Sequence, residues 1–174
     1  PWPPLSGFLL MACGMFRAVR DIQIVSASLT QIQAGLSASA DEISWVQTSY
    51  LVSEVVMIPL SGFLARALST KWLFVLSSAG FTIASVLCAT ATSINEMIVY
   101  RSIQGFVGGA MIPTMYAGMF LMFGRRAQTG VSVAVSLIVT LAPTIGPALG
   151  GWISEVASWH WLFLVNIIPG IIIT

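Results

Sequence analysis

Long apolar segments recur along this chain, and each is about as long as a helix that crosses a lipid bilayer. A crossing helix needs about 20 mainly apolar residues, and the sequence divides into five such segments and a shorter sixth. We expect membrane-spanning helices at about 5–30, 45–64, 72–91, 97–120, 130–153 and 161–174. The sequence therefore predicts an all-α integral membrane protein.

Composition supports this class and argues against several others. The chain is 57% hydrophobic and 7% charged, with net charge +1, whereas soluble domains average about 25% charged residues. No basic face points to nucleic acid. Cys13 and Cys88 are each alone in an apolar segment, and the single histidine, His160, is flanked by two tryptophans. We therefore expect packing thiols, an interfacial histidine, no metal and no cofactor.

The ends of the chain suggest a piece of a longer protein. It begins at Pro1 rather than methionine, and its sixth apolar segment stops in mid-helix at Thr174. Leu5–Phe16 is apolar like the core of a signal peptide, but no basic region precedes it and no cleavage site follows. We expect a fragment that lacks both ends.

Positive charges in the connecting loops predict the orientation. Arg66 and Lys71 flank the second connection, and Arg125 and Arg126 occupy the fourth. The first, third and fifth connections carry acidic residues and no lysine or arginine. The positive-inside rule places the second and fourth connections in the cytoplasm.

Five charged residues fall inside the apolar segments, where an Arg, Lys or Asp costs at least about 2.5–3.5 kcal/mol. They are Arg17, Arg20 and Asp21 in the first segment, Glu54 in the second and Arg101 in the fourth. One interpretation is a structural ion pair of Arg17 with Asp21, which are four residues apart. The other is an internal polar cavity, in which Asp21 or Glu54 is the partner of Arg101.

The fifth segment contains a smooth face and two prolines. Ala142, Gly146 and Gly150 recur every four residues, which places them on one side of a helix and allows close approach of a neighbouring backbone. Pro143 and Pro147 each remove a backbone donor and are expected to bend the helix. We expect this face to pack on another helix.

Five motifs in order along the chain resemble those of the major facilitator superfamily. The first-span motif begins at Asp21, the loop motif covers 62–71, and the fourth-span motif R-x-x-Q-G begins at Arg101. The fifth span carries Gly146-Pro147 followed by Gly150-Gly151, and 159–166 reads W-H-W-L-F-L-V-N. Together they are most similar to the fourteen-span drug:proton antiporters of the EmrB/QacA type.

This resemblance implies a fold and a set of site residues. Residues 1–174 would be a partial transporter domain, the N-terminal six-helix half, made of two inverted three-helix repeats with the sixth helix truncated. Proton coupling would involve Asp21, Glu54 and Arg101, with Arg101 biasing proton binding at the carboxylates. The motif residues with conformational roles would be Gly105, Gly108, Gly146, Pro147, Gly150 and Gly151, and the loop motif would retain Gly62 and Lys71.

The resemblance also implies a function: proton-coupled efflux of amphipathic or cationic organic compounds across the cytoplasmic (inner) membrane, with no catalytic residues. Substrates, protons and lipid would be its partners, together with a periplasmic adaptor and an outer-membrane channel. An uptake or lipid-handling porter on the same fold remains an alternative. So does a non-transporting membrane scaffold or remnant.

Several residues depart from the family pattern. Arg66 replaces the aspartate of the loop motif, so a charge relay built on that aspartate does not carry over. Arg17 and Arg20 occupy positions where the family is usually apolar. Two extra cations beside Asp21 would favour its ionised form and oppose proton cycling, which leaves a specialised or damaged copy open.

Overall fold

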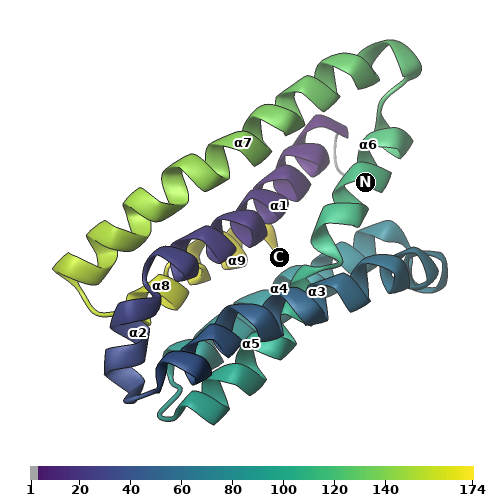
Figure 1. Cartoon of the computed structure of the whole chain (residues 1–174). Coiled ribbons are helices and arrows are strands. Elements are labelled where there is room, and N and C mark those ends of the chain that lie inside the picture. Colours follow the sequence, from purple (N-terminus) through teal and green to yellow (C-terminus); the bar gives the residue numbers. More distant parts are fainter. Residues whose placement is uncertain (1–3) are drawn as a thin grey trace.

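The computed structural model describes residues 4–174, and these residues form helices and short connections (Figure 1). In chain order the helices are α1 (Pro4–Ala27), α2 (Leu29–Leu36), α3 (Ala40–Leu68), α4 (Thr70–Ala89), α5 (Ile94–Gly108), α6 (Met111–Met122), α7 (Arg125–Val156), α8 (His160–Leu164) and α9 (Ile167–Ile173). The described part of the chain contains no strand. An all-α fold is thereby confirmed.

Three of the expected spans are interrupted helices. The first span is divided between α1 and α2, the fourth between α5 and α6, and the sixth between α8 and α9. Pro113 cannot donate to the carbonyl of Gly109, nor Pro169 to that of Val165, because proline lacks an N–H. Each of these acceptors lies at a break, which explains two of the three interruptions. Nothing in the local sequence explains the break after Ala27.

Four helical paths are long and apolar enough to cross a membrane by length and composition. They are α3, α4, α7 and the continuous path through α5 and α6, Ile94–Met122. Helix α1 contains three charged residues, Arg17, Arg20 and Asp21, and the path His160–Ile173 is shorter. Large apolar side chains also cover the outside: Val55, Phe63 and Leu121 are 65%, 60% and 76% exposed. A surface of this kind suits contact with lipid.

The packing of the helices is symmetric between the two halves of the chain. The first helix of the first triplet, α1, packs most extensively along α7, which is the second helix of the other triplet. Correspondingly, α5 packs most extensively along α3 (Figure 1). The third helical path of the first triplet, α4, contacts α5, and the third path of the second triplet, α8–α9, contacts α1. This exchange of partners is what two inverted three-helix repeats require.

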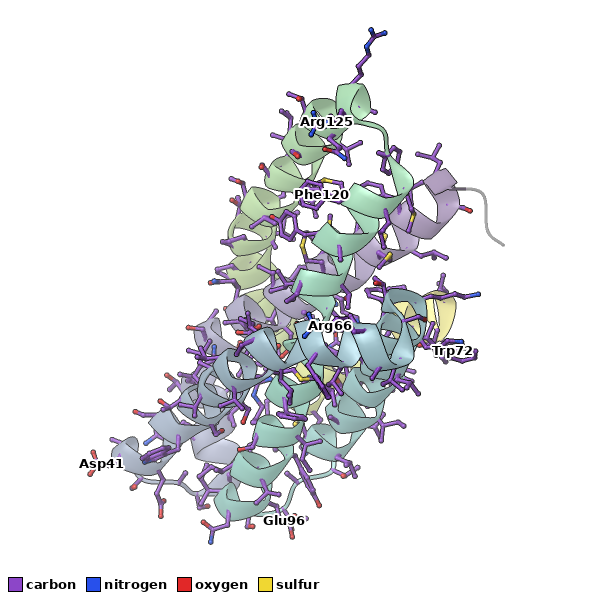
Figure 2. The ribbon with its side chains drawn as sticks, turned by 90° about the vertical axis from the view of Figure 1, so that its right-hand side faces the viewer. Asp41, Arg66, Trp72, Glu96, Phe120 and Arg125 are labelled. Atoms are coloured by element: carbon purple, nitrogen blue, oxygen red, sulfur yellow. The ribbon has the colours of Figure 1, made fainter. Side chains whose placement is uncertain are left out.

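The first and third connections lie at one end of the molecule, and the fourth lies at the other (Figure 2). Figure 2 places Asp41 and Glu96 at one end and Arg125 at the other. At the first end, Ser39 and Glu42 form a capping box that starts α3, with Ser39 N–H donating to Glu42 Oε2 at 2.9 Å. Acidic side chains in a first turn also suit the positive end of the helix dipole.

Candidate functional site

An ion pair buried inside the six-helix half joins α1 to α5. Arg101 donates from Nη1 to Asp21 Oδ2 at 2.6 Å, and neither side chain has any exposed surface. The two residues are 80 positions apart in the chain. Of the two carboxylates considered as partners of Arg101, the structure brings Asp21 to it.

The remaining donors of Arg101 are bound by the surrounding helices. Nη1 also donates to Gln104 Oε1 at 2.7 Å, Nη2 donates to Gln47 Oε1 at 2.8 Å, and Nε donates to the carbonyl of Val46 at 3.3 Å. The guanidinium also lies 4.3 Å from the centre of the Tyr50 ring, a favourable cation–π distance. A buried ion pair is stable only when such additional contacts offset its desolvation.

The network continues from Arg101 to α4. The side-chain amide of Gln104 donates to Ser85 Oγ at 2.8 Å, and the thiol of Cys88 donates to Gln104 Oε1 at 3.6 Å. Four helices, α1, α3, α4 and α5, therefore meet in one continuous set of polar contacts. Sequence reasoning missed Ser85 and gave Gln104 only as a motif letter.

Arg17 binds away from Asp21. Its Nη2 donates to the carbonyl and hydroxyl of Ser78 at 2.9 and 3.0 Å, and its Nη1 donates to Thr82 Oγ1 at 2.8 Å and to the carbonyl of Asn166 at 3.3 Å. Among the described residues, no hydrogen bond or ion pair joins Arg17 to Asp21. Arg17 therefore anchors α1 to α4 and to the junction of α8 and α9, and the direct ion pair considered above does not form.

Asn166 is the functional candidate that sequence reasoning left without a role. It lies between α8 and α9, is 1% exposed, and donates from Nδ2 to Asp21 Oδ1 at 2.8 Å. Arg20 donates to its Oδ1 at 2.9 Å. One signal was available in the sequence: Asn166 is the only polar residue between Trp161 and Ile173.

Glu54 lies apart from this network. Its side chain is buried, with the residue 8% exposed, and Oε1 has no hydrogen-bond partner. The hydroxyl of Tyr50, one turn earlier on α3, is also buried without a partner. Within the described residues, no hydrogen bond connects Glu54 to Arg101 or Asp21. Glu54 therefore lies near the other two residues expected to couple protons but outside their hydrogen-bond network.

The glycines of α5 allow α3 to approach closely. A Cβ at Gly105 would meet the backbone oxygen of Tyr50, and a Cβ at Gly108 would lie 3.0 Å from the Phe81 ring and 3.1 Å from the Tyr50 hydroxyl. Any larger residue at Gly105 would push away the backbone of α3 that carries Tyr50 and places its ring beside Arg101. These two glycines therefore help to position the ring that stacks on the guanidinium.

The smooth face of α7 packs on α1, as the sequence predicts. Ala142, Gly146 and Gly150 are buried, and a Cβ at Gly146 would lie 2.5 Å from Gln23 Cβ. A Cβ at Gly150 would lie 2.7 Å from the backbone oxygen of Ile24. The other two motif residues differ: Pro147 is exposed and Gly151 has open space beside it. Only the glycines at 146 and 150 contact α1 closely.

We expect Gly146→Leu to force α7 away from α1, because overpacking a close helix contact costs about 1–3 kcal/mol. The protein should be inserted in the membrane but transport poorly, with a lower unfolding temperature. Gly151→Leu is the matched control, since its side chain would enter open space. Equal transport rates for the two variants would show that close contact between α1 and α7 is not needed for transport.

The loop-motif residues lie outside the buried network. Gly62 is exposed with open space beside it, and Lys71 is exposed in the first turn of α4. A groove on the outside of α7 is also separate from the network; it is lined by Thr129, Ser132, Val133, Ser136, Leu137 and Thr140. Among residues 4–174, no group of three His, Cys, Asp or Glu side chains has metal-binding geometry.

These features define a class of protein: a multi-helix membrane protein with inverted repeats and a buried charge network at their interface. Comparison with known proteins gives the family. Residues 8–174 match the Major Facilitator Superfamily, and the chain belongs to this family of transporters. It is a multi-pass protein of the inner membrane.

Three relatives show where in the family the chain falls. It is 48% identical over 166 residues to the colistin resistance protein EmrB of Acinetobacter baumannii, covering 95% of this chain and 32% of that protein. It is 35% identical over 177 residues to the fatty acid resistance protein FarB of Neisseria gonorrhoeae, covering 98% and 35%. It is 36% identical over 163 residues to the putative multidrug resistance protein MdtD of Yersinia enterocolitica, covering 94% and 35%. The chain thus spans about a third of the length of these relatives, and its similarity to EmrB-type and other multidrug resistance proteins is confirmed.

Proposed function

We propose that the intact protein exports amphipathic or cationic organic compounds in exchange for protons. The observation that carries this proposal is the Asp21–Arg101 ion pair, which links the first helices of the two repeats in a fully buried position. The names of the three relatives refer to resistance against colistin, fatty acids and multiple drugs, and resistance is most simply obtained by export.

In the proposed cycle, Asp21 binds and releases the coupled proton. While Arg101 contacts Asp21, the ion pair favours the ionised carboxylate. When the helices shift and Arg101 moves away, the carboxylate loses its counter-charge and binds a proton. The protein alternates between inward-open and outward-open states, and this movement carries the substrate across the membrane. The substrate itself is not changed covalently. Glu54 is a second proton-binding candidate, supported by its buried and unpartnered oxygen.

The same proposal includes the assembly partners of the intact protein. A periplasmic adaptor and an outer-membrane channel would carry the compound across the rest of the envelope. This part rests on the family resemblance. Co-purification of the tagged full-length protein with an adaptor from its own cells would support it.

The transport proposal is tested with the full-length protein in proteoliposomes, with ethidium as the probe. We expect an imposed proton gradient to drive ethidium against the direction of proton flow. Movement of ethidium in the same direction as the protons would instead indicate an uptake porter. A scaffold without transport activity would give the same traces as empty liposomes, even in counterflow without a gradient.

A further inference from the structure

We propose that Asn166 is a positioning residue that, together with Arg20, sets the pH at which Asp21 binds its proton. This inference rests on the proton-binding role proposed for Asp21. It concerns the oxygen of Asp21 that Arg101 does not contact. Arg101 binds Oδ2, whereas Asn166 donates from Nδ2 to Oδ1 at 2.8 Å. Each carboxylate oxygen therefore accepts one hydrogen bond from a different element.

The orientation of the Asn166 amide is fixed by charges on both sides. Its Oδ1 accepts from Arg20 Nη2 at 2.9 Å, and a guanidinium can only donate. Its Nδ2 faces the carboxylate of Asp21, which when ionised can only accept. A flipped amide would oppose donor to donor and acceptor to acceptor. The amide therefore presents its N–H to Asp21 and its oxygen to Arg20.

The backbone of Asn166 is held independently of its side chain. Arg17 Nη1 donates to the carbonyl of Asn166 at 3.3 Å, and the N–H of Gly170 donates to the same carbonyl at 3.0 Å. A Cβ at Gly170 would collide with Thr82 and with Arg17. Two arginine side chains of α1, three residues apart, thus hold one asparagine. Arg17 binds the backbone carbonyl of Asn166, and Arg20 binds the side-chain oxygen of Asn166.

Asp21 thus has one donor on each carboxylate oxygen. A hydrogen-bond donor aimed at a carboxylate stabilises its charge, and a protonated carboxyl group accepts that bond less strongly. Because Asn166 lies at the break between α8 and α9, movement of the sixth helical path would withdraw this donor. Loss of the Arg101 and Asn166 contacts together would release Asp21 from both of its donors, which makes proton uptake depend on two helices and not one.

Other groups around the Asp21–Arg101 pair also influence the charge of Asp21. Helix α7 has no charged residue between Arg126 and Glu155. The titratable or charged side chains near the pair come from α1, α3, α4 and α5: Arg17, Arg20, Tyr50, Glu54, Cys88 and Arg101. The substitution of Asn166 changes none of these charges; it removes the hydrogen bond to Asp21 and the acceptor that holds Arg20.

The test is an infrared titration of the purified full-length protein, which needs no transport. The carboxylic acid band that disappears in Asp21→Asn reports protonation of Asp21. In Asn166→Leu, similar in size but without donors, we expect the midpoint of this band to move up by about one to two pH units, the effect of one hydrogen bond to a charged group. Asn95→Leu is the matched control, because Asn95 is exposed at the start of α5, and its midpoint should be unchanged.

Two further variants keep the test decisive if Asn166→Leu is unstable. Asn166→Ser is too short to reach Asp21, and Arg20→Gln removes the charge behind the amide; both should raise the midpoint, Arg20→Gln by less. An unchanged midpoint in the folded Asn166 variants overturns the inference and reduces Asn166 to a packing residue. If the wild type shows no band that depends on Asp21, the inference and the proposed proton-binding role both fall. A shifted midpoint in a protein that does not move ethidium would uphold the inference and reject the transport proposal alone.

Discussion

Arg101→Ala is expected to abolish proton-driven export, whereas Arg101→Lys should retain part of it. Alanine leaves Asp21 as a buried carboxylate without its cation, and removing one member of a buried pair costs about 3–5 kcal/mol. It also leaves the acceptors on Gln47, Gln104 and Val46 without their donor. A lysine ammonium can reach Asp21, but it lacks the planar group that donates in several directions and stacks on Tyr50.

The measurement is the initial rate of ethidium movement under an imposed proton gradient, normalised to the amount of folded protein. Arg125→Ala serves as the control, because it also removes an arginine but at an exposed position. Arg125 lies at the end of the molecule opposite Asp41 and Glu96 (Figure 2). Gradient-driven export by Arg101→Ala would contradict the switch role and leave Arg101 with a packing role.

Asp21→Asn is expected to separate substrate exchange from proton coupling. Asparagine has nearly the same shape and can still accept from Arg101, but it cannot bind or release a proton. Gradient-driven export should fall to the level of empty liposomes. Counterflow of ethidium without a gradient should persist in the protein that folds, because alternating access itself needs no proton in this scheme.

The matched control for this variant is Asp41→Asn, an exposed aspartate in the first turn of α3. It should keep both activities. Asp21→Asn leaves three arginines, Arg17, Arg20 and Arg101, in the buried region without that carboxylate, so a lower unfolding temperature is also expected. Normal export of cationic compounds by Asp21→Asn would rule out Asp21 as the coupling residue.

The two extra arginines of the first helix acquire a specific meaning in the structure. From the sequence, Arg17 suggested a direct ion pair with Asp21, and the two arginines together left a specialised or damaged copy open. In the structure they bind Ser78, Thr82 and Asn166, with the closest contact at 2.8 Å. Arg17 therefore connects α1 to α4, and Arg20 binds the side-chain amide of Asn166 that donates to Asp21. This arrangement is compatible with a specialised transporter.

The sequence by itself determined the class of this protein and its helical order. Runs of about 20 apolar residues require helices in lipid, because the backbone must satisfy its own hydrogen bonds there. The four-residue spacing of Ala142, Gly146 and Gly150 predicted a packing face, since such spacing repeats on one side of a helix. The order of the motifs indicated the family. These inferences depend on residues close together in the chain, or on the order of short motifs along it.

Only the tertiary structure decided which charges meet. Arg101 pairs with Asp21, 80 residues away, and leaves Glu54 outside the network, although both carboxylates were available partners on the sequence alone. Arg17 and Asp21 share a helix face at a spacing that permits an ion pair, yet Arg17 instead binds α4, where Thr82 and Ser78 accept from its Nη1 and Nη2. Asn166 gained its role in the same way. Side-chain partners inside a membrane protein are chosen by which acceptors the packed helices bring within hydrogen-bond distance, and local sequence does not contain that information.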